Sequence, residues 1–209
     1  MAIFNSYLLG KAKKSVGNIT LCYRNLKNIA QAKVFSRRDN PTPEVLDQRA
    51  RVRVLGKLGR RLLPAVRKGF VGVGDGTTSN AFMSENMGAV EVTADHVATV
   101  DFARLKVASG LQDEPQVEVV YDAESATYSF TQAGVTEEDG FCGADDKVYG
   151  VLLEEELSKV KLVTLKTRGE GGVTSFPLPS GWNADNVHVY CFATTANGRM
   201  ASDSRHVEV

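Results

Sequence analysis

The chain contains few of the residues that build metal sites, disulfide frameworks and stacking platforms. Its 209 residues include three cysteines, three histidines and one tryptophan. The cysteines, Cys22, Cys142 and Cys191, are odd in number and lack metal-ligand spacing, so we expect free thiols in a reducing compartment. No apolar run reaches the roughly 18 residues of a membrane span, and residues 1–14 lack the order of a signal peptide. We therefore expect a soluble protein made in the cytoplasm, without a membrane partner.

Motifs that bind phosphate or calcium are incomplete. Residues 72–79 are rich in glycine, but they lack the spacing and the lysine of a P-loop, and Asp75 would repel phosphate. Acidic residues gather at 137–139 and at 145–146 without the ligand spacing of an EF-hand. We interpret the glycine-rich segment as a flexible hinge and the acidic segments as solvated loops. No metal and no cofactor is predicted.

No group of residues predicts a catalytic site. Residues 202–204 and His206 include the residue types of a catalytic triad, but neighbours on one strand alternate between its faces. Cys142 lies among glycines and acidic residues, which disfavour a reactive thiolate. Trp182 is interpreted as a core anchor or a lid over one end of the β domain rather than as a platform for a sugar. We therefore predict that the protein is not an enzyme.

Charge is divided sharply along the chain, although the formal net charge is zero. Residues 1–70 hold 16 Lys and Arg against 3 Asp and Glu, which gives +13. Residues 71–209 hold 9 Lys and Arg against 22 Asp and Glu, which gives −13. This asymmetry indicates that the basic part binds nucleic acid, an acidic surface or another copy of the chain.

A basic amphipathic helix is predicted over residues 42–70. Thr42 suits the N-cap and Pro43 the first helical position, whereas Pro64 should break or kink the helix near Leu63. Apolar residues occupy one half of the helical wheel: Val45, Val52, Val54, Leu55, Leu58, Leu62, Leu63, Ala65, Val66 and Phe70. The opposite third is the predicted interaction surface: Arg49, Arg53, Lys57, Arg60, Arg61, Arg67 and Lys68.

Three interpretations of this basic surface stay open. It can be a solvated charged face, as such stripes usually are. It can bind nucleic acid, which the density of arginine favours, although no recognised module or interleaved stacking aromatics accompany it. It can also dock onto the acidic surface of a neighbouring copy, because the same chain supplies a matching acidic domain.

The N-terminal residues predict an arm and a β-hairpin. Residues 1–17 form a short apolar patch followed by lysines, and strands are expected over 18–24 and 29–35 with a turn over Asn25–Asn28. An isolated hairpin is marginally stable in water, so it needs a partner. We expect the arm to lie on something else, such as a neighbouring subunit.

From Ala89 onward the pattern predicts strands separated by turns rich in Gly, Pro, Asp and Asn. A short helix over 79–87 precedes them, and Asn197-Gly198 is the clearest hairpin signal. The strands are expected near 90–93, 98–107, 116–121, 126–132, 147–153, 159–166, 172–177, 186–194 and 201–208. Short strands at such intervals are typical of an antiparallel immunoglobulin-like β-sandwich, although no Cys–Trp–Cys pattern is present.

Three stretches carry a resemblance to a known family: KKSVGNITLCYR, NPTPEVLDQRARVRVL with the following PAVRKGF, and VHVYCFATTANGRMASDSRHVEV. They resemble an uncharacterised family of proteins from Bacteroidota and their bacteriophages. The family brings no established activity and no catalytic residues. The resemblance implies an N-terminal hairpin and helices followed by an immunoglobulin-like sandwich.

Together these observations predict an α+β, mainly β protein with three parts. Residues 1–40 are the arm and hairpin, 41–88 the basic helical region with its glycine-rich hinge, and 89–209 the acidic immunoglobulin-like sandwich. We predict a structural component of a bacteriophage virion, such as a ring, a head–tail connector or a tail part. Its partners would be other copies of itself and neighbouring virion proteins. The alternatives are a nucleic-acid-binding protein and a sandwich adhesin.

Overall fold

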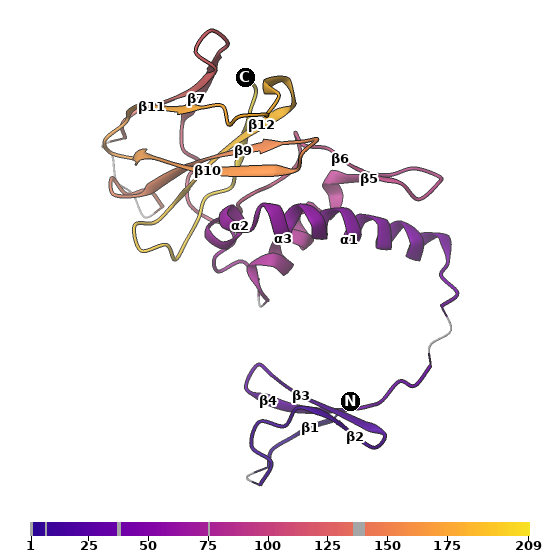
Figure 1. Ribbon diagram of the computed structural model, residues 1–209. Helices are drawn as coiled ribbons and strands as arrows, with labels where there is room; N and C mark the ends of the chain where they lie inside the picture. The colour runs from indigo at the N-terminus through magenta and orange to yellow at the C-terminus, as the bar shows by residue number, and fades with distance from the viewer. Residues whose placement is uncertain (1, 7, 37–38, 75, 136–140) are drawn as a thin grey trace. The chain divides into compact units, whose positions relative to one another are not determined.

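The computed structural model describes residues 2–6, 8–36, 39–74, 76–135 and 141–209. It is α+β and mainly β, with 21% helix and 37% strand, and its sheets are antiparallel, which confirms the predicted class at this level. The chain divides into two compact units, Met1–Pro41 and Thr42–Val209 (Figure 1). The division lies beside the border predicted at residue 40.

The N-terminal unit is a four-stranded sheet in the order β1-β4-β3-β2. The predicted hairpin is β3 (Ile19–Arg24) and β4 (Lys27–Ala32). The arm supplies the two outer strands, β1 (Ala2–Phe4) and β2 (Lys14–Val16). The arm therefore pairs with the hairpin of its own chain, whereas the sequence led us to expect it on a neighbouring subunit. Backbone hydrogen bonding explains the difference, because a lone hairpin leaves both of its edges unpaired.

The main unit begins with helices that start and stop where the sequence predicts. Helix α1 (Pro43–Arg61) has Thr42 at its N-cap, and α2 (Leu63–Gly69) follows after a break that Pro64 causes. Helix α3 (Thr78–Asn86) begins at Thr77, whose side chain accepts a hydrogen bond from the backbone N–H of Asn80 at 3.2 Å. A short 3-10 helix, η1 (Met87–Ala89), continues α3.

Strands of the main unit form two facing sheets and a short separate pair. The four-stranded sheet has the order β10 (Lys159–Thr167), β9 (Lys147–Glu154), β12 (Val187–Thr194), β13 (Arg205–Val207). The three-stranded sheet has the order β11 (Gly172–Pro177), β8 (Thr127–Gln132), β7 (Val117–Asp122). The separate pair is β5 (Val90–Val92) and β6 (Ala98–Val100), and a 3-10 helix, η2 (Ala184–Asn186), precedes β12. The predicted Asn197-Gly198 turn is present, with Gly198 at φ +67°.

The four-stranded sheet is buried on both faces, so the main unit has three layers. On one face, Tyr149, Val151 and Leu153 of β9 pack in the core that the helices cover. On the other face, Val148 and Leu152 pack in a second core with the three-stranded sheet. Figure 1 shows the helices and the β7–β11 side of the three-stranded sheet on opposite sides of β9 and β10. The helical region and the β region thus share a core within one compact unit, whereas the sequence led us to expect two parts with a border at residue 88 and a glycine-rich hinge over residues 72–79.

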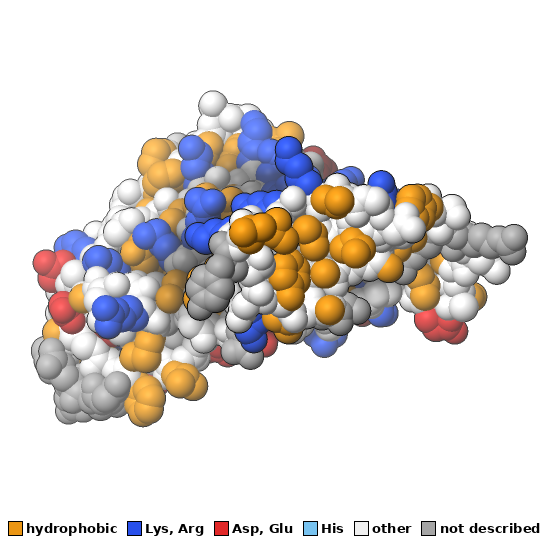
Figure 2. Space-filling view, turned by 90° about the horizontal axis from the view of Figure 1, so that it is seen from below, with side chains coloured by type: hydrophobic (Ala, Val, Ile, Leu, Met, Phe, Trp, Pro, Cys, Tyr) orange, Lys and Arg blue, Asp and Glu red, His pale blue; other side chains and the backbone are white. Residues whose placement is uncertain are grey.

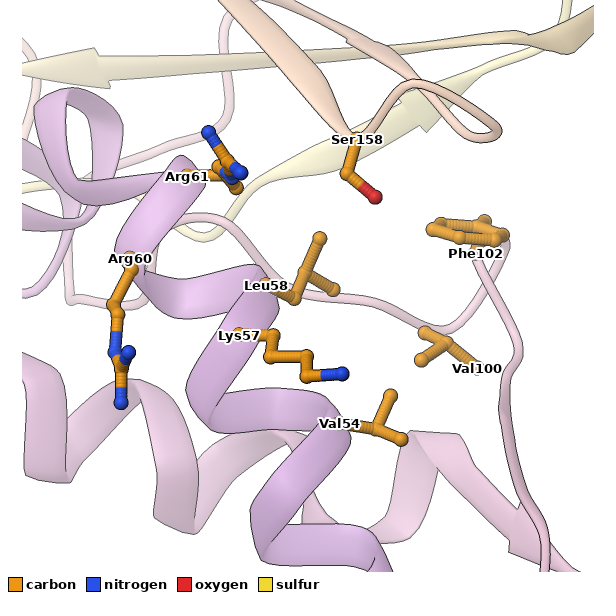
Figure 3. A pocket seen from close by; sticks show the side chains of 8 residues that line it. All are labelled: Val54, Lys57, Leu58, Arg60, Arg61, Val100, Phe102 and Ser158. Atoms are coloured by element: carbon orange, nitrogen blue, oxygen red, sulfur yellow. The ribbon is translucent and has the colours of Figure 1, made fainter.

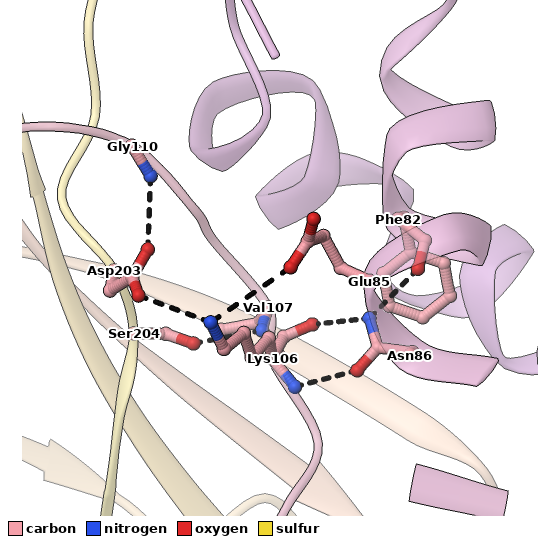
Figure 4. A network of polar contacts seen from close by, with 8 residues as sticks. All are labelled: Phe82, Glu85, Asn86, Lys106, Val107, Gly110, Asp203 and Ser204. Atoms are coloured by element: carbon pink, nitrogen blue, oxygen red, sulfur yellow. Dashed lines mark hydrogen bonds and ion pairs between the residues drawn. The ribbon is translucent and has the colours of Figure 1, made fainter. Parts of the chain in front are cut away.

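The predicted strand over 98–107 ends at Val100, because a side chain turns the backbone away. The carboxylate of Asp101 accepts a hydrogen bond from the N–H of Ala103 at 3.0 Å, which makes a local turn. Further along this segment, Leu105, Val107 and Ala108 are buried in the helical core but belong to no strand. The segment's polar backbone groups bind side chains instead: Lys106 N–H donates to Asn86 Oδ1 at 2.7 Å, and Val107 N–H donates to Ser204 Oγ at 2.9 Å (Figure 4).

Replacement by alanine at two helical glycines, Gly69 and Gly56, should change the stability of the fold in opposite directions. A Cβ added at Gly69 would lie 2.5 Å from the Cβ of Ala108, whereas a Cβ at Gly56 would meet no atom within 4 Å. We expect Gly69→Ala to lower the free energy of unfolding by about 3 kcal/mol, because both backbones are fixed in the core. Gly56→Ala should raise it by about 0.5–1 kcal/mol, because alanine loses less backbone entropy in a helix. Urea denaturation followed by circular dichroism measures both, and equal effects at the two positions would contradict this packing.

The side chain of Asn86 is fully buried, and its amide satisfies three backbone groups. The Nδ2 group donates to the carbonyl oxygens of Phe82 and Lys106, each at 2.9 Å, and Oδ1 accepts from Lys106. We expect Asn86→Ala to cost about 2–4 kcal/mol of stability, since buried backbone groups lose their partners. The exposed Asn80 on the same helix is the matched control, and Asn80→Ala should change stability by less than about 0.5 kcal/mol. Similar losses of stability for the two variants would show that the hydrogen bonds of the Asn86 side chain do not stabilise the fold.

Candidate interaction surface: a basic groove beside helix α1

A groove lies where the second half of α1 faces the turn between β9 and β10. It begins as a cavity of about 660 Å³. Side chains from α1 form one wall, β6 and Phe102 form the other, and Ser158 of the β9–β10 turn closes one end (Figure 3). The lining residues are Val54, Lys57, Leu58, Arg60, Arg61, Val100, Phe102 and Ser158.

A second cavity, of about 630 Å³, continues the groove along the outer edge of β10. Arg60, Arg61 and Ser158 line both cavities. The second cavity is further lined by Leu63, Pro64, Lys159, Val160, Lys161, Pro179, Ser180 and Trp182. We call the two cavities together the basic groove.

Cations and apolar side chains are both part of the basic groove. Lys57, Arg60 and Arg61 lie three and four residues apart on α1, so they reach the same side of the helix. Lys159 and Lys161 add two cations from β10, and none of the described lining residues is acidic. Val54, Leu58, Val100 and Phe102 add apolar atoms beside the α1 cations (Figure 3). An anion that also carries an apolar group therefore fits the groove better than a bare anion does.

The other predicted basic residues lie outside the groove. Arg49, Arg53 and Arg67 are exposed on the helices. The face of the molecule in Figure 2 carries many more Lys and Arg side chains than Asp and Glu side chains. Lys68 instead packs on the core, with its Nζ 5.0 Å from the ring centroid of Tyr149 and 3.5 Å from the hydroxyl oxygen. Thus three of the seven predicted residues, Lys57, Arg60 and Arg61, meet in one place.

Sequence reasoning missed the β-strand side of the groove. Lys159, Lys161 and Phe102 belong to segments that we had predicted as ordinary strands. The alternation of lysine with apolar residues in β10 marks an exposed edge. Nothing local shows that this edge lies beside α1, because that neighbourhood depends on how the helices cover the sheet.

Residues that resemble a catalytic triad have structural roles. The hydroxyl of Ser202 accepts a hydrogen bond from Ala193 N–H at 2.9 Å and donates to the carbonyl of Asp203 at 2.8 Å. Burial raises the pKa of Asp203, but hydrogen bonds from Gly110 N–H and from Lys106 outweigh it and lower the pKa below its usual value. His206 lies against the Tyr190 ring, at 5.2 Å between centroids.

The remaining candidates also belong to the framework. Burial raises the pKa of the Cys191 thiol to about 12, so this thiol stays protonated at neutral pH. Trp182 is 8% exposed in the second core, which agrees with its predicted role as a core anchor. Asp146 is buried and accepts a hydrogen bond from Gln112 Nε2 at 2.9 Å. The acidic residues 137–139 lie outside the described part of the chain.

Comparison with models of known protein families, with curated proteins and with solved structures finds no match. The resemblance to phage-associated proteins therefore stays a prediction. Among the described residues, no helix is both long enough and apolar enough to cross a lipid bilayer.

Proposed function

We propose that this chain is a non-enzymatic structural protein that assembles with other copies of itself and with neighbouring proteins. The observation that carries the proposal is the composition of the basic groove. Its cations lie beside aliphatic side chains and Phe102, and a protein–protein contact likewise combines apolar side chains with polar ones. An acidic segment of a neighbouring protein, with an apolar side chain among its carboxylates, matches this pattern.

Charge supports an acidic partner that the chain itself supplies. Residues 42–209 hold 17 Lys and Arg against 24 Asp and Glu, so the main unit has a net charge of −7 in spite of the groove. Residues 1–41 hold 8 Lys and Arg against 1 Asp, a net charge of +7. Copies that present unlike charge to each other are attracted before they touch. Contacts between different surfaces of identical chains generate rings or stacks.

A bacteriophage virion component, such as a ring, a head–tail connector or a tail part, is the specific form of this proposal. It is supported by the resemblance of the three quoted stretches to phage-associated proteins. An immunoglobulin-like sandwich is proposed for the main unit. Its support is the packing of a four-stranded and a three-stranded antiparallel sheet over one core.

Assembly through the groove predicts sensitivity to salt and to charge reversal. We expect the double variant Arg60→Glu, Arg61→Glu to weaken self-association at least roughly tenfold, because acidic surfaces then meet acidic side chains. Raising the salt concentration should weaken the native contact in the same direction, since exposed charges are screened within about 8–10 Å. Sedimentation velocity over a concentration series measures both effects.

The matched control is Arg104→Glu with Arg199→Glu, which makes the same change in net charge at exposed positions outside the groove. This variant should associate within about twofold of the native chain. Equal weakening by the two double variants would contradict a role for the groove. Circular dichroism and urea denaturation check that each variant is folded.

Nucleic-acid binding is the alternative that a specific observation favours. Arg49 and Arg53 lie exposed on α1 beside the groove cations, so a phosphate backbone could follow the helix. The alternative predicts that single-stranded or duplex DNA binds with an affinity that falls steeply as salt rises. It also predicts that Arg53→Glu, Arg60→Glu abolishes this binding. A fluorescence titration that shows no binding at low salt would leave the assembly function alone.

An adhesin that binds carbohydrate through its loops has less support. The one tryptophan, Trp182, is packed in the second core and is 8% exposed, so little of its ring is open to a sugar. Binding to a glycan array that persists in the assembled protein would revive this interpretation.

A further inference from the structure

The N-terminal sheet has an apolar face that its own unit leaves largely uncovered. Strand register places Val16 opposite Ile19 and Leu21 opposite Ala30, so these side chains share one face. Val16 is 71% exposed and Ile19 is 49% exposed. A sheet with one apolar face buries that face against another layer.

The N-terminal unit covers this face only at the end near Asn28, away from Val16 and Ile19. There the side chain of Asn28 accepts a hydrogen bond from Ala12 N–H at 3.0 Å and donates one to the carbonyl of Gly10 at 2.8 Å. Among the described residues 2–6, 8–36 and 39–41, the buried ones are Ala12 and Asn28. A unit of this size with so small a core needs another surface for its stability.

A complementary surface exists on the main unit. In β7, Val117 and Val119 point into the second core, so Glu118, Val120 and Asp122 lie on the outer face of the three-stranded sheet. Val120 is 63% exposed, and Val173 of β11, on the same outer face, is 55% exposed. The strand between them contributes the small side chain of Ser129. Within the main unit this face lies open to solvent, and Glu118 and Asp122 make it acidic.

Two surfaces of a second copy could cover the N-terminal sheet: its own N-terminal sheet, or the outer face of its three-stranded sheet. Charge favours the second. Lys14 shares the apolar face, and the Nζ of Lys11 lies 5.4 Å from the ring centroid of Tyr23, which is on the same face. Two copies of this sheet packed face to face would bring these lysines together, which costs free energy. On the outer face of the three-stranded sheet the same lysines meet Glu118 and Asp122, so unlike charges surround apolar side chains.

We propose that the N-terminal sheet of one copy stacks on the outer face of the three-stranded sheet of a second copy. The inference rests on the proposed assembly function and adds a second contact to it, separate from the basic groove. The stacked sheets bury Val16 and Ile19 against Val120 and Val173, as facing sheets in a sandwich do. Because the two surfaces differ, the contact leads from copy to copy and forms a ring or a stack.

Exposed side chains make the contact testable without disturbing the fold. We expect Val16→Asp and Val120→Asp each to weaken self-association of the full chain at least roughly tenfold, since each buries a carboxylate beside apolar or acidic groups. The matched controls are Ile3→Asp, on the opposite face of the N-terminal sheet, and Val97→Asp, between β5 and β6. Ile3 and Val97 are 59% and 57% exposed, so the controls should associate within about twofold of the native chain.

Cross-linking separates contact between copies from contact within one copy. Two single variants, Val16→Cys and Val120→Cys, are made in a background in which Cys22 and Cys142 are serine, and are mixed before a short bismaleimide reagent is added. A covalent dimer that forms in the mixture supports the proposal. A third variant carries both Val16→Cys and Val120→Cys in one chain. If this variant is cross-linked within the chain but the mixed single variants give no covalent dimer, the proposal is wrong. Assembly unaffected by Val16→Asp and Val120→Asp would also overturn it.

The same experiment distinguishes this inference from the proposed function. If the full chain assembles but gives no cross-link between copies, the stacking contact is wrong and the assembly function stands. If the full chain stays monomeric at every concentration and salt tested, both are wrong. If the Arg60→Glu, Arg61→Glu variant still gives the cross-link, the two contacts are independent.

Discussion

The fold depends on the alternation of side chains along β9 and β12, which serve two cores at once. Tyr190 and Phe192 pack under the helices, whereas Val189, Cys191 and Ala193 pack against the three-stranded sheet. Every residue from Val189 to Ala193 is thereby buried. This double burial holds the helical core on one face of the sheet, with α2 against β12, and α1 packs on α2, α3, β5 and β6 so that it lies beside the basic groove. It also leaves the three-stranded sheet as an outer layer with an open face.

Local chemistry explains why the element boundaries follow from the sequence. Pro43, Pro64 and Asn197-Gly198 determine the backbone around them whatever lies nearby, and α1, α2 and the last hairpin follow the predictions. The three-layer arrangement, in contrast, depends on contacts between residues far apart in the sequence. The unbroken apolar runs Val148–Leu153 and Val189–Ala193 are a signal for strands buried on both faces, but we had assigned them to a sandwich with one core. The path of residues 105–108 through the helical core has no such signal, because Asn86 and Ser204 bind its backbone from distant parts of the chain.

For the interaction surface, too, the sequence predicted what neighbouring residues determine but not which distant segments meet. Helical periodicity brought Lys57, Arg60 and Arg61 together, since their spacing alone places them on one side of α1. It could not reveal that Lys159 and Lys161 face them across the groove, or that Lys68 lies over Tyr149. Charge counts along the chain were informative in another way. The unlike charges of the N-terminal unit and the main unit suggest how copies meet, whichever surfaces they use.

Electron microscopy of the purified full chain at low salt tests the central claim most directly, because it yields the mass, the symmetry and the path of each chain together. The account predicts a closed ring or a regular stack in which density for residues 2–36 lies on the three-stranded sheet of the adjacent copy. A single copy, with its N-terminal sheet folded onto its own main unit, would contradict the account.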